Sequence, residues 1–155
     1  MRLSTRVRYG TRLLVDIAAN QADAPLALKD VALRQQVSLN YLKQLMAPLV
    51  AAGVVRTERG SGGGVMLAHS PQDIRLSRVV SIFEGSSAPV ACVDSPSVCS
   101  RSSDCATRGV WCRMKTAIDD VLDSVTIRDL VEQQRMTAPS GGGAVCPELD
   151  QGASR

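Results

Sequence analysis

The hydrophobic residues in the first third of the chain recur with a helical period. In residues 6–19 the apolar side chains lie three and four positions apart and the arginines fall on the other side, which predicts an amphipathic helix. Residues 26–35 predict a second, shorter helix, which a tight connection joins to Ser38. Serine is a favoured N-cap, so we expect a third helix to begin at Leu39. Two helices, a tight turn and a capped helix are typical of a helix-turn-helix, whose last helix enters a groove of DNA.

A β-hairpin is predicted directly after the third helix. Pro48 should kink or end that helix, and Gly53 is a helix stop. The β-prone segments 54–59 and 65–68 flank the glycine-rich residues 60–64, which is typical of a hairpin and, after a recognition helix, of a wing. The competing interpretation of these glycines is a nucleotide-binding P-loop. That loop requires a lysine and then Ser or Thr at the start of a helix, and neither follows here.

The second half of the chain predicts one long helix between less regular segments. Residues 77–84 predict a short helix, and residues 85–104, rich in Ser, Pro, Gly and Cys, predict a loop. Residues 106–125 predict a helix with an apolar stripe made of Val110, Trp111, Met114, Ala117, Ile118, Val121, Leu122 and Val125. The core of a small winged helix leaves this stripe without a partner, and a second copy of the chain is the simplest one. Residues 127–135 predict a further short helix.

The expected fold class is mostly α with a small β-hairpin wing: a winged helix-turn-helix followed by a long C-terminal dimerisation helix. We expect a DNA-binding domain at residues 1–84 and a cysteine-rich loop at 85–105. The dimerisation helix and a terminal helix should occupy 106–135. Residues 136–155 are rich in Pro, Ser and Gly, which predicts a disordered tail.

The distribution of charged residues along the chain indicates a binding partner. The first 60 residues carry nine Lys and Arg against four Asp and Glu, whereas the rest carries nine against eleven. A basic first third suits nucleic acid, with Lys43 and the N-terminal arginines attracting phosphates, although a solvated basic surface has the same composition. No apolar run reaches the roughly 18 residues that span a bilayer, and no apolar signal region follows the basic N-terminus. We therefore expect a cytoplasmic protein without a membrane partner.

Cysteines supply the candidate chemistry. The chain has five: Cys92, Cys99, Cys105, Cys112 and Cys146. In a chain expected to be cytoplasmic, clustered cysteines point to metal or redox chemistry rather than to disulfides. Zinc sites favour cysteines with two to four residues between them, whereas five or six residues lie between successive cysteines from Cys92 to Cys112, which favours an iron–sulfur cluster in an open loop. Cys112 is either a further thiolate ligand or a small core residue beside Trp111, and Cys146 is expected to be a spare thiol.

Several separated pieces of the chain resemble the iron–sulfur cluster regulators, the IscR-type repressors, whose relatives include iron and nitric-oxide sensors. The matching pieces are Met1–Ser4 with Arg8 and Tyr9, Val37–Leu45, Gly53–Arg56, Arg59–Gly64, the triplet Cys92, Cys99 and Cys105, and Ile127–Val131. The resemblance covers about residues 1–135. It implies a homodimeric winged-helix regulator of transcription whose long C-terminal helices cross at the dimer interface.

The same resemblance assigns residues that face double-stranded DNA. The recognition-helix positions are Ser38, Asn40, Tyr41, Lys43 and Gln44, and the wing position that enters the minor groove is Arg59. The amides of Asn40 and Gln44 can read adenine edges, Lys43 can contact guanine or phosphate, and a narrow minor groove attracts arginine. The alternative is that some of these side chains are only solvent-facing helix residues.

The resemblance also implies that Cys92, Cys99 and Cys105 hold an iron–sulfur cluster. In relatives with a [2Fe–2S] centre a histidine follows the third cysteine by three residues, and this chain has Arg108 there. The missing histidine favours [4Fe–4S] over [2Fe–2S], with Cys112 as the tentative fourth ligand. His69, the only histidine, is expected at the surface, and Arg8 stands where some relatives have a ligating acid.

We therefore expect a homodimeric DNA-binding regulator, a repressor rather than an activator, whose binding an iron–sulfur cluster modulates in response to iron, redox state, nitric oxide or cluster status. One alternative is a clusterless winged-helix repressor controlled by a protein partner or a metabolite, as in regulators of cysteine metabolism. A thiol enzyme is the other. It is disfavoured because the chain lacks Cys-x-x-Cys and has only His69 to activate a thiol, so we expect no catalysis.

Overall fold

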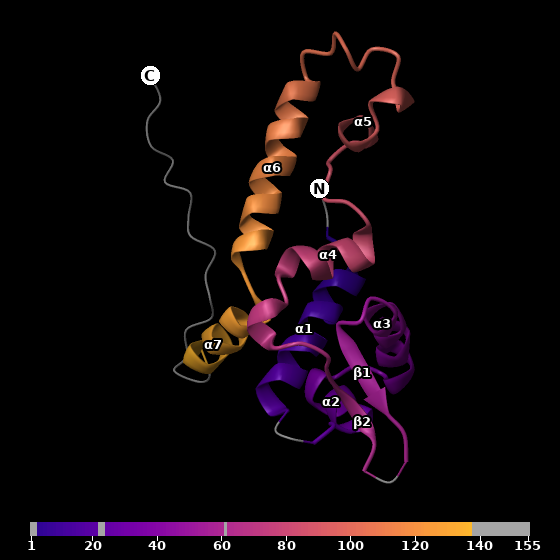
Figure 1. Cartoon of the computed structure of the whole chain (residues 1–155), viewed down its shortest axis with the longest axis vertical. Helices are drawn as coiled ribbons and strands as arrows, with labels where there is room; N and C mark the ends of the chain where they lie inside the picture. The colour runs from indigo at the N-terminus through magenta and orange to yellow at the C-terminus, as the bar shows by residue number, and fades with distance from the viewer. Residues whose placement is uncertain (1–2, 22–23, 61, 138–155) are drawn as a thin grey trace.

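The computed structural model describes residues 3–21, 24–60 and 62–137 (Figure 1). In chain order the elements are α1 (Thr5–Asn20), α2 (Leu28–Gln35), α3 (Leu39–Ala51), β1 (Val55–Glu58), β2 (Gly64–Leu67), the 3-10 turn η1 (Pro71–Asp73), α4 (Leu76–Glu84), α5 (Ala91–Asp94), the 3-10 turn η2 (Pro96–Val98), α6 (Arg108–Ser124) and α7 (Ile127–Thr137). The fold class predicted from the sequence, mostly helical with a two-stranded wing, is confirmed. Cys146 and nearly all of the predicted tail lie outside the described residues.

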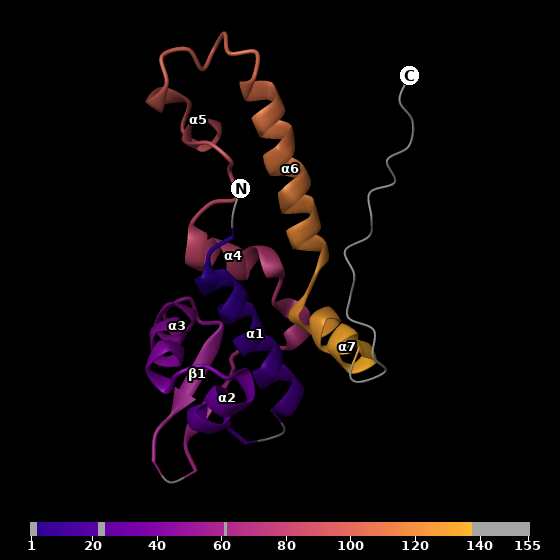
Figure 2. The same cartoon turned by 180° about the vertical axis from the view of Figure 1, so that it is seen from behind.

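Helix α1 is the centre of the core. Ser4 caps it by accepting a hydrogen bond from the backbone N–H of Val7 at 3.3 Å. Its apolar face is buried, and α2, α3, α4, α7 and β2 all pack against it. Gly10 lets α4 approach closely, because a Cβ at this position would lie 2.3 Å from the ring of Phe83. Around α1 the helix-turn-helix, the wing and α7 share one core (Figures 1 and 2).

The turn between α2 and α3 has the predicted chemistry. Gln36 ends α2 in the left-handed conformation with φ 56°, and Ser38 caps α3 by accepting from the backbone N–H of Tyr41 at 3.2 Å. The helix stop predicted at Gly53 is confirmed, whereas of the kink or end predicted at Pro48 the end is wrong, because α3 continues to Ala51. Proline removes one backbone donor, but the buried side chain of Leu49 keeps the last turn on the core, and its carbonyl accepts from a later N–H.

The wing is tied to the segment before α2. Strands β1 and β2 pair antiparallel, with Val55 opposite Leu67. Leu26 adds a bridge to Val65 through two backbone hydrogen bonds of 2.9 and 2.8 Å, so the helix predicted from residue 26 begins only at Leu28. Gly64 is required here, since a Cβ would lie 2.2 Å from the carbonyl oxygen of Leu26. The glycine-rich run is thus the connection of a hairpin.

Helix α6 leaves the core and α7 returns to it. A bridge between Arg75 and Thr126 holds the chain where α6 ends, and Ile127 and Val131 of α7 are buried beside α1. The predicted helix over residues 106–125 begins two residues later, at Arg108. The segment predicted as a loop contains the short helices α5 and η2, which the sequence analysis missed because neither is long enough to show a period.

The apolar stripe on α6 divides between two faces. Leu122 packs against the core of its own chain. Val110, Met114 and Val121 are 42%, 38% and 64% exposed, so they form the part of the stripe that the chain itself leaves uncovered. Among the described residues no helix is both long enough and apolar enough to cross a membrane.

Candidate nucleic-acid interface

Helix α3 presents a polar row on its exposed side. Ser38, Asn40, Lys43 and Gln44 are exposed. Between them, Leu42 and Leu45 are almost completely buried and anchor the helix on α1 and α2. The structure therefore brings four of the five predicted recognition-helix side chains to one accessible surface.

Tyr41 is placed differently from its neighbours. It is half-buried, and its ring packs edge-on against Tyr9 of α1, with centroids 5.8 Å apart and an interplanar angle of 87°. Its hydroxyl is buried and has no hydrogen-bond partner among the described residues. Tyr41 thus joins α3 to α1, and its hydroxyl is turned away from the surface that the polar row occupies.

The wing adds a cation beyond the end of β1. Arg59 is exposed and directly follows Glu58, the last residue of that strand. Gly60 and Gly62 turn the chain with φ values of 101° and 86°, which residues with a Cβ rarely adopt. Arg59 therefore projects from the hairpin connection rather than from the paired strands.

An ion pair between the buried Asp16 and the exposed Arg34, which the sequence analysis missed, fixes α2 against α1. Asp16 is 5% exposed, and its carboxylate accepts from Arg34 (Nη2 to Oδ2, 2.7 Å) and from Gln35 (Nε2 to Oδ1, 3.0 Å). The hydrogen bonding of Arg34 to the Asp16 carboxylate, with Arg34 as the donor, is the main reason that the pKa of Arg34 is raised above its ordinary value. An acid inside the apolar run Leu13–Ile17 was the available signal, because a buried carboxylate requires partners.

The cysteine segment, which we define as residues 85–107, connects α4 to α6. Cys92, Cys99 and Cys105 of this segment and Cys112 of α6 are free thiols and partly accessible. No three His, Cys, Asp or Glu side chains in the described ranges are grouped as a metal site would require. The hydroxyl of Thr107, 3.2 Å from the Cys105 sulfur, is the main cause that lowers the pKa of Cys105, and the backbone N–H groups of Thr107 and Arg108 act in the same direction.

Arg108 closes the cysteine segment at its far end. Its Nε donates to the backbone carbonyl of Cys92 at 3.0 Å, which ties the first turn of α6 to α5 across sixteen residues. A guanidinium stays protonated and has no lone pair to give a metal. The side chain at the position where the resemblance implies a histidine is therefore a tether here.

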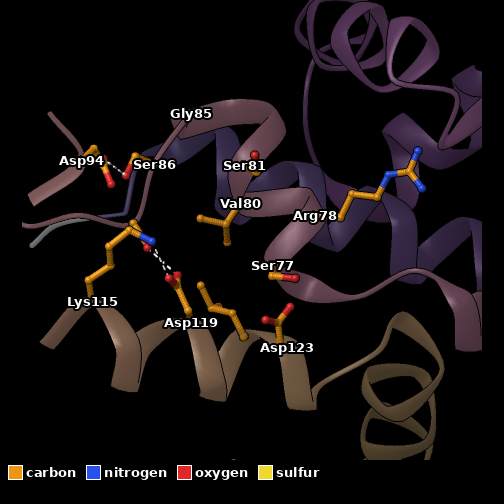
Figure 3. Close-up of a pocket in the computed structure, with 12 residues that line it drawn as sticks. Ser77, Arg78, Val80, Ser81, Gly85, Ser86, Asp94, Lys115, Asp119 and Asp123 are labelled. Carbon is orange, nitrogen blue, oxygen red and sulfur yellow. Dashed lines mark hydrogen bonds and ion pairs between the residues drawn. The ribbon is translucent and has the colours of Figure 1, made fainter. Parts of the chain in front are cut away.

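A group of hydrogen-bonded polar side chains connects the cysteine segment with α6. These side chains border a cavity of about 470 Å³, which lies between α4, the residues directly after α4, and α6 (Figure 3). Ser87 and Lys115 both donate to the carboxylate of Asp119 at 2.5 Å, and Ser86 donates to Asp94. The hydrogen bond from Lys115 is the main cause that lowers the pKa of Asp119. His69 lies elsewhere, exposed beside the wing.

Comparison with known proteins gives consistent matches over most of the chain. A family described as "Rrf2: Iron-dependent Transcriptional regulator" matches residues 3–133. The protein named "Protein rrf2" of Nitratidesulfovibrio vulgaris is 40% identical over 131 residues, which are 84% of this chain and 87% of that protein.

Two solved structures of similar sequence have the same fold. CymR, "the Global Cysteine Regulator of B. subtilis", is 32% identical with a TM-score of 0.72, covering 86% of this chain and 98% of that one. "T. potens IscR" is 32% identical with a TM-score of 0.73, covering 92% and 94%. The chain is thus about equally similar, in sequence identity and in fold, to a CymR and to an IscR.

The placement of Tyr41 leads to a stability prediction. Tyr41→Phe keeps the ring contact with Tyr9 and removes a buried hydroxyl without a partner, so the free energy of unfolding should rise by about 1 kcal/mol. Tyr41→Ala, which removes the ring, should lower it by about 3 kcal/mol. Urea denaturation measures both. A clear loss of stability in Tyr41→Phe would mean that the hydroxyl has a partner in the folded protein.

Proposed function

The chain belongs to the Rrf2 family of transcriptional regulators, and we propose that within it this protein is a cytoplasmic homodimer that binds double-stranded DNA under the control of an iron–sulfur cluster. Its named relatives are transcriptional regulators, and this protein is likewise a regulator and not an enzyme. The observation that carries DNA binding is the exposed polar row of a capped, anchored α3, in a chain whose wing also exposes the cation Arg59.

Each exposed side chain has a role in this proposal. Asn40 and Gln44 offer amides that match the donor and acceptor of an adenine edge in the major groove, and Lys43 contacts guanine or a phosphate. Ser38 holds the first turn of α3, and Arg59 enters the minor groove next to it. Tyr41 positions the helix through Tyr9 instead of offering its hydroxyl to a base.

The uncovered face of α6 supports the dimer. Val110, Met114 and Val121 lie four and seven residues apart, which places them on one side of the helix, and all three are exposed in the single chain. A parallel or crossing α6 of a second copy would remove this stripe from water. Two recognition helices would then be held at a fixed separation, as half-sites on DNA require.

The donor chemistry of the cysteine segment fits an iron–sulfur cluster on Cys92, Cys99 and Cys105. A bound cluster supplies a centre that responds to iron and oxidants and is held by thiolates. The surroundings of Cys105 favour its thiolate, and Arg108 brings Cys92 to the start of α6, where Cys112 is the proposed fourth donor. Without a ligating histidine, [4Fe–4S] is favoured over [2Fe–2S].

The chain's own contacts would carry a change in the cysteine segment to DNA. Ser87 of the segment donates to Asp119 of α6, which Lys115 of the same helix also holds, so a change in the order of the segment would act on α6. The second candidate function is a clusterless regulator controlled by a protein or metabolite. The spread of the cysteines, with no three donors grouped in the described part of the chain, favours it.

The wing is tested with duplexes that the wild-type protein selects from a random pool. Arg59→Ala should weaken binding about tenfold on duplexes with a narrow A·T minor groove and little on G·C-rich flanks, measured by fluorescence anisotropy. Arg56→Ala is the matched control. It removes the same charge from β1, where Arg56 lines a cavity together with His69 instead of projecting from the hairpin connection. Equal binding by Arg59→Ala and wild type on all duplexes would refute the wing contact, and a wild type that selects no duplex would refute the function.

The dimer is tested on α6. Val121→Asp puts a charge into the uncovered stripe, and burying it unpaired costs several kcal/mol, so the variant should be monomeric in light scattering. The single chain leaves Val121 64% exposed, so the fold itself should survive, which circular dichroism checks. Thr116→Asp adds the same charge at an exposed position outside the stripe and should remain a dimer. A dimeric Val121→Asp would exclude this interface.

The cluster is tested on protein purified without oxygen. Wild type should contain iron and sulfide and absorb visible light, Cys99→Ala should contain none, and Cys146→Ala should match wild type. Cys112→Ala should lose its visible absorbance faster in air than wild type. Identical decay rates would remove Cys112 from the ligands, and iron-free wild-type protein would leave the clusterless regulator as the function.

A further inference from the structure

The guanidinium of Arg12, on α1, is held in place although it lies at the surface. Its Nε donates to Oε1 of Gln35 at 3.0 Å, and its Nη2 donates to the backbone carbonyl of Gln35 at 3.3 Å. It also lies over the ring of Tyr9, 5.1 Å from the centroid. Two hydrogen bonds and one ring face therefore fix a side chain that would otherwise be mobile in water.

These contacts place Arg12 next to the recognition helix. Tyr9 packs edge-on against Tyr41, in the first turn of α3. Arg8, one turn earlier on α1, also lies over the Tyr9 ring, 5.4 Å from its centroid. Two cations of α1 thus share one aromatic ring at the edge of the polar row on α3.

The orientation of Gln35 is set from inside the protein. Its Nε2 donates to the buried carboxylate of Asp16 at 3.0 Å, so its amide oxygen must face outward, toward Arg12. Arg34 donates to the other oxygen of the same carboxylate, Oδ2. The exposed guanidinium of Arg12 is therefore aligned by the buried carboxylate of Asp16, through Gln35 as the positioning residue.

We propose that Arg12 is a preorganised contact to a phosphate of the DNA backbone, at the edge of the groove that α3 enters. This rests on the proposed function. A guanidinium has five N–H donors, and Gln35 uses two, so the others remain for a phosphate. No acid of the described residues forms a salt bridge with Arg12, so its charge is free for this role. In helix-turn-helix proteins the helix directly before the recognition helix crosses the backbone, and Arg12 is bonded to the last residue of that helix, Gln35 of α2.

The test separates charge from preorganisation by the salt dependence of binding to a duplex of arbitrary sequence, measured by fluorescence anisotropy. Arg12→Ala should reduce the slope of log Kd against log salt by about 0.9 for each bound protomer, whatever the sequence. Arg12→Lys keeps the charge but loses the forked donors, so the slope should stay while binding weakens about threefold. Arg135→Ala removes the same charge from α7 and should change neither.

The outcomes distinguish this contact from the proposed function. If wild type binds with a steep salt slope and Arg12→Ala has the same slope, the phosphate contact is refuted and DNA binding stands. An equal loss of slope in Arg135→Ala would reduce the effect to net charge, and undiminished binding by Arg12→Lys would refute preorganisation. A wild type without DNA affinity would refute the proposed function itself.

Discussion

The buried carboxylate of Asp16 is the constraint on which the arrangement of the proposed DNA-binding surface depends. A carboxylate that is 5% exposed is costly unless its oxygens are bonded, and here Arg34 and Gln35 of α2 supply the donors. Because both donors lie in the last turn of α2, their hydrogen bonds to Asp16 fix where the end of α2 packs on α1. The turn at Gln36 and the capped start of α3 at Ser38 follow within three residues, so the recognition helix inherits this position.

The same carboxylate has an effect at the surface. Through Gln35 it orders Arg12, and through Tyr9 the side chain of Arg12 is connected with Tyr41 of α3. A polar surface is usually flexible, and binding then costs side-chain entropy. In this protein the surface next to the proposed recognition helix is already ordered. Arg12 is bonded to Gln35, and Gln35 cannot move without leaving the buried carboxylate of Asp16 short of a donor.

The candidate regulatory end of the molecule is built by different forces. The cysteine segment has no buried apolar residue of its own, and polar contacts hold it to α6: Arg108 donates to the carbonyl of Cys92, and Ser87 donates to Asp119. Within α6, Lys115 donates to the same carboxylate (Figure 3). Such contacts are individually weak and easily rearranged. A rigid core at one end and a polar, thiol-bearing segment at the other, joined by α6, is an arrangement in which a chemical change can move one part without unfolding the other.

Periodicity, caps and turn residues were enough to predict the longer helices, the wing and the apolar stripe on α6, because these depend on neighbours within a few positions of the chain. The choice of Ser38, Asn40, Lys43, Gln44 and Arg59 as outward-facing positions came instead from the resemblance to a known family. The bridge that delays α2 to Leu28, the inward turn of the Tyr41 hydroxyl, the partners of Asp16 and the tether at Arg108 could not be predicted in this way. Each joins residues that are sixteen or more positions apart, or depends on which side of a helix meets the core. A sequence determines local conformation through nearby residues, whereas the partner of a buried polar group is decided only when the helices have packed and water has been removed from it.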